Sequence, residues 1–174
     1  MKALTIRQPW ARFIAQTDET DQPKRVENRT WAPPASMLGA EFLIHVSCST
    51  PTKLIQEAHC WIQRAFGEPP DFGRWDGDLL NEWELRCLRL VAGRIVCRVR
   101  LVGLVHAGEP VWSLQGRDAY VREQAASPWY VGPYGWVLEL VEAYECSPVV
   151  KGCLGLWEVP TDVVSQLVPK NPNS

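Results

Sequence analysis

The sequence predicts an α+β fold, a small mixed β-barrel with flanking helices. Segments with strand-like alternation are interspersed with helical segments, and no regular strand–helix–strand rhythm favours a doubly wound sheet. Fourteen prolines and twelve glycines imply many turns, which suits a barrel with loops better than a helical bundle. A length of 174 residues, with 46% hydrophobic and 22% charged residues, suits one folded domain with one core.

The N-terminal third begins with a short strand at residues 3–6. Pro9 is tolerated in a first helical turn, and Trp10, Phe13 and Ile14 then follow the i, i+3, i+4 spacing of one apolar helix face. An acidic loop is expected at 18–21. Residues 24–31 look extended, and the two prolines after them end that segment.

A strand at 41–47 and a helix at 52–66 follow. The strand alternates, with Phe42, Ile44 and Val46 on one face and Leu43, His45 and Ser47 on the other. The helix has an expected buried stripe of Leu54, Ile55, Ala58, Trp61 and Ile62. Residues 67–77 form a loop rich in Gly and Pro, and a second helix is expected to end near Leu90.

The clearest β pattern is residues 92–106, where Gly103 marks a bulge or bend. A short helix is expected at 117–126, strands at 134–144 and 154–159, and a closing helical turn at 162–168. Together these elements predict a single domain over residues 1–168, with an insert at about 52–90 and a flexible tail at 169–174.

Charge and composition exclude several classes of function. A net charge of −2 and a pI near 5.9 disfavour a protein that coats duplex by neutralising many phosphates. The six cysteines contain no C-x-x-C pair, so we expect free thiols, no metal and no cofactor. The N-terminus lacks a signal-peptide stretch and no apolar run could span a bilayer, so we expect a cytoplasmic protein with no membrane association.

Three separated segments carry a family likeness. They are residues 3–11 (ALTIRQPWA); residues 24–31 (KRVENRTW) ahead of a strand ending at 44–47 (IHVS); and residues 135–139 (GWVLE), followed by 150–152 (VKG) and 154–157 (LGLW). In this order and spacing the chain resembles the ASCH domains of the PUA-like barrels over residues 3–159. The resemblance is weakest over the insert at about 52–90.

The resemblance implies a β-barrel whose cleft receives RNA, DNA or a modified nucleoside. ASCH-like proteins include nucleic-acid-binding modules, ribonucleases and small amidohydrolases that act on acylated cytidine, so the fold does not settle the activity. The amidohydrolases have a lysine followed three residues later by a threonine, together with a distant glutamate. Lys24 matches the lysine, Glu27 stands at the threonine position, and Glu123 is the candidate for the glutamate. The missing hydroxyl argues against hydrolysis by that route.

Residues 24–29 (KRVENR) hold more side chains that could bind a ligand or take part in catalysis than any other segment. If the segment is extended, Lys24 and Glu27 lie on opposite faces. Glu27 beside arginines should stay ionised and could accept a hydrogen bond from a base edge; alternatively, it forms a structural ion pair. Lys24 could serve as a base if the cleft buries it. Arg29 is expected to line the same cleft.

Other candidates each have a structural alternative. Arg7 and Gln8 could form an anion site where the first strand becomes a helix, or Gln8 merely caps the helix. His45 and Ser47 share a strand face without converging on one proton, which favours a cleft-lining or hydrogen-bonded histidine over a catalytic one. Lys151 precedes Gly152, a residue that allows close backbone approach.

The chain has nine tryptophans. Each has a large apolar ring and one N–H donor, so we expect them in core regions next to polar pockets or on binding surfaces. In the loop at 127–136 (SPWYVGPYGW), Trp129 and Tyr130 could stack on bases or plug the barrel end. Trp10 and Trp31 fit either core or cleft wall. A row of arginines at positions 94, 98 and 100 is expected on a solvated outer face, with a phosphate track as the alternative.

Three functions follow. The leading expectation is a module that binds RNA, single-stranded nucleic acid or a modified nucleoside in a basic, aromatic-walled cleft. The second is a metal-independent hydrolase, either a ribonuclease or an amidohydrolase of acylated cytidine. The third is a protein-interaction domain that presents tryptophans on its surface.

Overall fold

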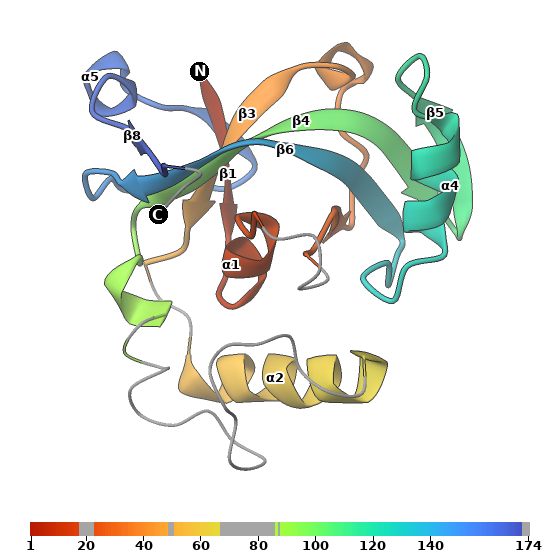
Figure 1. The fold of residues 1–174 in the computed structure, drawn as a ribbon, viewed down its shortest axis with the longest axis horizontal. Helices are drawn as coiled ribbons and strands as arrows, with labels where there is room; N and C mark the ends of the chain where they lie inside the picture. The colour runs from red at the N-terminus through yellow and green to blue at the C-terminus, as the bar shows by residue number, and fades with distance from the viewer. Residues whose placement is uncertain (18–22, 49–50, 67–85, 87, 172–174) are drawn as a thin grey trace.

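The structure is a computed structural model that describes residues 1–17, 23–48, 51–66, 86 and 88–171 (Figure 1). Its centre is an eight-stranded sheet that curls into a half-barrel. The main path runs in the order β2 (Val26–Arg29), β6 (Tyr134–Cys146), β4 (Ile95–His106), β3 (Glu41–Val46), β1 (Lys2–Ile6) and β7 (Leu156–Glu158). β5 (Glu109–Ser113) also pairs with β4, and β8 (Val168–Pro169) with β6. β1 and β3 are parallel, and the other pairs are antiparallel. The expected mixture of strands and helices around a barrel-like sheet is confirmed.

Of the helices whose bounds the described residues define, one is long and the others are short. They are α1 (Trp10–Ile14), the 3-10 helix η2 (Ala35–Met37), α2 (Thr52–Phe66), α4 (Asp118–Ala125) and α5 (Thr161–Val164). The bounds of α2 are those the sequence predicts. Among the described residues, no helix combines the length and the apolarity needed to cross a bilayer.

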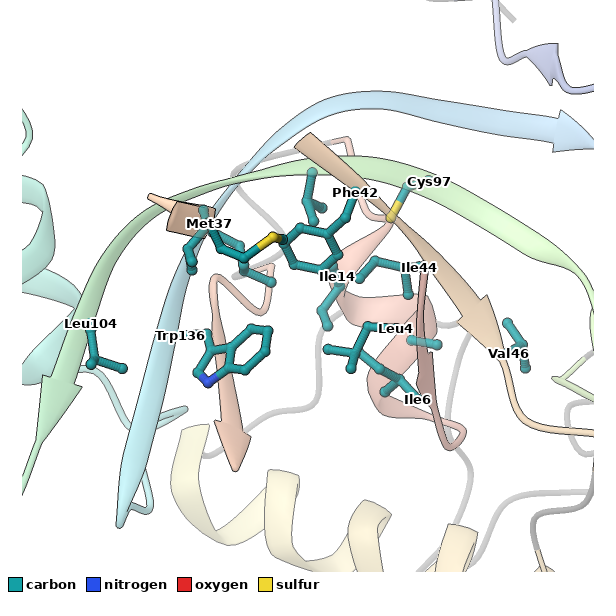
Figure 2. Close-up of a cluster of buried hydrophobic side chains, with 14 residues drawn as sticks. Leu4, Ile6, Ile14, Met37, Phe42, Ile44, Val46, Cys97, Leu104 and Trp136 are labelled. Atoms are coloured by element: carbon teal, nitrogen blue, oxygen red, sulfur yellow. The ribbon is translucent and has the colours of Figure 1, made fainter. Parts of the chain in front are cut away.

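The main core fills the inside of the curl (Figure 2). Alternate residues of the strands point inward, as Phe42 and Ile44 do from β3 and Trp136 does from β6. α1 closes this core with Ala11 and Ile14. Its Phe13 points the other way, to Ile62 of α2, so α1 lies between the sheet and α2 (Figure 1).

β3 lies between β4 and β1 in the sheet, and it is buried on both faces because a hydrophobic cluster packs against each face. The face with Phe42, Ile44 and Val46 packs in the main core, as its alternation predicts. Leu43, on the opposite face, packs in a second cluster with Ile95 and Val159. Val163 of α5 also packs in this second cluster.

Gly103 marks a bulge, as predicted. The register between β4 and β6 shifts between Leu101 and Gly103. A Cβ at Gly103 would stand 2.3 Å from Cγ2 of Val121, so the missing side chain lets α4 approach the sheet.

Several expectations differ from the structure. β2 begins at Val26, so Lys24 precedes the strand; β5 and β8 have no predicted counterpart. Leu54, expected in the buried stripe of α2, is 36% exposed. The tail at 169–174 begins with paired residues, since Pro169 belongs to β8 and the amide of Lys170 donates to Ala143 O. The expected loops at 18–21 and 67–77, and most of the second expected helix, lie outside the described residues.

Candidate functional site

A cavity of about 320 Å³ opens where β2, α1, α2 and the loop after α4 meet. This volume falls in the range of small-ligand pockets. Its walls are Trp10, Lys24, Glu27, Asn28, Trp61, Trp129 and Val131. The cavity therefore combines three indole rings with an acid, a base and an amide.

The three tryptophans pack against one another. The centroid of Trp10 lies 5.6 Å from that of Trp61 and 6.3 Å from that of Trp129, both edge to face. Trp61 and Trp129 are 5.8 Å apart and tilted. Because the rings touch, a flat ligand would lie against the open face of the trio, not between its members. Trp129 is only 3% exposed, so most of its surface belongs to the core, with Phe66 at 4.5 Å behind it.

Lys24, Glu27 and Arg29 form an ion cluster at the polar wall. Lys24 Nζ donates to Glu27 Oε2 at 2.6 Å and also to Val26 O. Arg29 Nη2 lies 3.1 Å from Glu27 Oε1 and donates to Thr5 O at 3.2 Å. An ammonium has three N–H donors, and within the described part of the chain two of those on Lys24 have acceptors. The third donor and the remaining lone pairs of Glu27 are the polar groups that a ligand could use.

Burial controls the protonation of Lys24, which is 3% exposed. Desolvation lowers the pKa of its ammonium, the charge and hydrogen bond of Glu27 oppose this shift, and the charge of Arg29 adds to it. A lysine with a lowered pKa can exchange a proton near neutral pH more readily than an exposed one.

The chain before β2 explains why Lys24 faces Glu27. The amide of Lys24 donates to Phe13 O at 3.1 Å, and the guanidinium of Arg25 donates to Ile14 O and Gln16 O, both at 2.9 Å. These bonds fix residues 24–25 to the end of α1. The alternation of an extended strand starts only at Val26, so the expectation that Lys24 and Glu27 lie on opposite faces is wrong.

Asn28 fixes the aromatic loop to β2. Its Nδ2 donates to Trp129 O at 2.8 Å, and its Oδ1 accepts from the amide of Val131 at 3.0 Å. Both halves of the amide are used, so Asn28 positions the cavity wall. Sequence reasoning did not identify this role, nor did it place Trp61 and Val131 at the site.

Two further candidates lie away from this cavity. The hydroxyl of Tyr130 donates to Pro133 O at 3.0 Å and accepts from the amide of Gly108 at 3.1 Å, while its ring packs beside Gly135. Tyr130 therefore holds the loop and does not line the cavity. Glu123 is an exposed residue of α4 that lines a different cavity, beyond Trp129, so it does not join Lys24 and Glu27.

The candidates at the end of β1 also lie elsewhere. Gln8 and Ser47 line a cavity of about 430 Å³ between the start of α1 and the start of α2, and Arg7 is exposed. Gln8 Oε1 accepts from the amide of Arg12 at 3.3 Å, but the N-cap of α1 is Pro9, and the same amide also donates to Pro9 O at 3.0 Å.

His45 is fully buried and both its ring nitrogens have partners. Val150 O can only accept, so Nε2 (3.0 Å) carries the proton, and Nδ1 accepts from Thr5 Oγ1 at 3.2 Å. Burial lowers the pKa of this imidazole, and the hydrogen bonds to Val150 and Gly93 oppose the shift. A Cβ at Gly152 would stand 2.5 Å from the His45 ring, so this glycine allows the close approach. The neighbouring Lys151 is exposed.

The arginine row is engaged in contacts within the protein. Arg100 pairs with Glu41 at 2.6 Å, and Arg98 lies 3.5 Å from Glu41 and 3.4 Å from Glu142. The guanidinium of Arg94 donates to Leu90 O and Ser147 O. This arrangement favours the solvated-face interpretation over a phosphate track.

Trp31 packs on the main core. Its ring meets Trp136 edge to face, with centroids 4.7 Å apart, and its carbonyl accepts from Trp136 Nε1 at 3.2 Å. It therefore belongs to the core and not to the cavity wall.

No protein-family model matches the chain, and no curated protein matches it. Within the described residues, no three His, Cys, Asp or Glu side chains gather as metal ligands, and the five cysteines found there are free thiols. The functional argument therefore depends on the cavity.

Proposed function

We propose that this protein is a nucleotide- or nucleic-acid-binding module that takes an unpaired base, from RNA or a modified nucleoside, in the cavity of Trp10, Trp61 and Trp129. The observation that carries this proposal is the convergence of those rings with the buried Lys24–Glu27 pair on one cavity of about 320 Å³. Indole rings stack on any base, and an adjacent donor and acceptor can pair with a base edge.

Charge and resemblance support the same class of ligand. Lys24 and Arg29 bring two cations to one carboxylate, which favours an anionic ligand locally although the chain carries a net charge of −2. The likeness of three segments to ASCH domains supports a PUA-like barrel with a nucleic-acid cleft. An unpaired base suits the cavity better than duplex, whose bases are stacked away from side chains.

The test is binding of labelled single-stranded RNA and of ribonucleoside monophosphates, measured by fluorescence anisotropy and by competition. Trp61→Leu removes a half-buried ring of the cavity and should weaken binding about tenfold, since one base–aromatic stack is worth about 1–3 kcal/mol. Lys24→Met should weaken binding with little change in side-chain volume. Trp112→Leu, a half-buried tryptophan outside the cavity, is the control. Unchanged binding in both cavity variants would disprove the assignment.

A metal-independent hydrolase is the second candidate, because burial lowers the pKa of Lys24 beside Glu27. In this hypothesis the neutral amine takes a proton from a water that attacks an amide carbonyl. The C–N bond then breaks and the proton passes to the leaving amine, so amide and water give acid and amine. Incubation with an acylated cytidine and with RNA, in EDTA, tests it. Turnover that Lys24→Met abolishes and the exposed-lysine control Lys53→Met preserves would support it, and no turnover would reject it.

A further inference from the structure

A second cavity, of about 340 Å³, lies against Trp129 on the side of α4. Its walls are Pro23, Arg25, Phe66, Tyr120, Glu123, Gln124, Ala126, Ser127, Pro128 and Trp129. Trp129 lines both cavities. Of two consecutive residues, Lys24 lines the first cavity and Arg25 lines the second.

Gln124 is the uncharged amide that this second cavity offers to a ligand. Its residue is 8% exposed and its side chain lines the cavity. Gln124 is not among the described side chains that have a buried polar atom without a partner, so its amide faces the water of the cavity. A ligand that enters the cavity displaces this water, and it keeps the hydrogen bonds of Gln124 only if it offers both a donor and an acceptor.

The remaining walls indicate what kind of group fits. The terminal nitrogens of Arg25 donate to Ile14 O and Gln16 O, so this side chain stabilises the fold. Glu123 places an exposed carboxylate at the rim, which repels phosphate. Tyr120 and Phe66 add aromatic surface. An amide that can both donate and accept, next to aromatic surface and an acid, suits a base edge and not a phosphate group.

A loop connects the two cavities. Ser127 and Pro128 line the second, Val131 lines the first, and Trp129 lines both. Asn28 holds this loop in place through Trp129 O and the amide of Val131. An extended ligand that follows the loop therefore meets both cavities in order.

We propose that the second cavity receives the nucleoside next to the one held in the first, so that the ligand of this protein is a single-stranded oligonucleotide and not a free nucleoside. This inference rests on the proposed function and adds a subsite to it. Gln124 hydrogen-bonds the edge of the second base, and the linking phosphate stays in solvent, outside the cavity and away from Glu123.

The experiment compares ribonucleoside 5′-monophosphates with the dinucleoside monophosphates ApA, CpC and UpU, by calorimetry or by quenching of tryptophan fluorescence. Each probe carries one phosphate group, but the monoester has nearly one more negative charge than the diester near pH 7. The effect of Gln124→Leu on each probe, taken relative to the wild type, therefore isolates the contribution of the second nucleoside. The wild-type protein should bind its preferred dinucleotide about tenfold more tightly than the matching mononucleotide. Gln124→Leu should weaken dinucleotide binding about fivefold and mononucleotide binding much less. Gln166→Leu makes the same chemical change at an exposed residue that lines neither cavity, and it should change neither affinity.

The outcomes separate the two proposals. Equal affinity for both probes, or an equal loss for both in Gln124→Leu, would overturn the second subsite and leave the first cavity intact. No binding of any probe would overturn the proposed function and this inference with it. Thermal melting of each variant shows that a loss of affinity does not arise from unfolding.

Discussion

Lys24 is subject to two opposing effects at the scale of a single residue. Burial disfavours its charge, while Glu27, 2.6 Å away, favours it. A buried ion pair of this kind adds little net stability, because desolvation offsets most of the attraction. Removing one partner is costly, since the other charge is then buried alone. The pair is therefore better explained by binding or chemistry at the cavity than by stability.

His45 allows a prediction about pH. Burial lowers its pKa in the folded protein below the ordinary value of 6.5, so between the two values the unfolded chain binds more protons. Stability should therefore fall as the pH decreases below about 6.5, until the pH reaches the lowered pKa of the folded imidazole. Urea unfolding at a series of pH values measures this loss.

The control for that measurement is the exposed histidine His106. His45→Gln should flatten the dependence of the unfolding free energy on pH between 5 and 6.5. His106→Gln should keep the wild-type dependence. A profile that is the same in both variants would show that His45 does not titrate as its burial requires.

At the scale of elements, the loop after α4 depends on β2. Asn28→Ala removes one hydrogen bond to Trp129 O and one from the amide of Val131. We expect a loss of about 1–3 kcal/mol in stability and weaker ligand binding, because Trp129 and Val131 are no longer held at the cavity.

The Val131 amide gives a direct readout of this prediction. Its hydrogen exchange, followed by NMR, should speed up in Asn28→Ala, while amides in the centre of β4 should change only with global stability. If Val131 exchanges as slowly as in the wild type, then Asn28 does not hold the loop.

The elements also show what could be predicted from the sequence. The bounds of α2 and the inward face of β3 follow directly from periodicity, because one apolar face determines each. The Lys24–Glu27 contact could not be predicted, because it depends on where β2 begins. That start is set by hydrogen bonds from the Lys24 amide and the Arg25 side chain to the end of α1, which have no sequence pattern. β5 and β8 are short strands whose pairing depends on neighbours distant in the chain.

At the scale of the molecule, the cavity is a product of topology. Its walls come from four separate segments of the chain, and the packing of α1 between the sheet and α2 brings them together. The sequence alone identified Lys24, Glu27, Trp10 and Trp129 as candidates by their chemistry. It did not place Glu123, Tyr130 or His45 correctly relative to this cavity, because no local pattern indicates which side of the barrel a residue faces.

The dependence of binding on salt tests this architecture as a whole. Each phosphate neutralised on a single strand changes the slope of log affinity against log salt by about −0.7. The chain carries a net charge of −2, and Arg98 and Arg100 are paired with carboxylates. The cavity has Lys24 in its wall, and Arg29, which does not line it, pairs with Glu27 beside it. We therefore expect a shallow slope for single-stranded RNA, between about −0.7 and −1.5, which corresponds to one or two phosphates. Arg100→Glu should leave that slope unchanged because Arg100 lies outside the cavity. A slope steeper than about −4 would require a phosphate track on the outer face of the sheet, and binding would then be a property of that surface and not of the cavity.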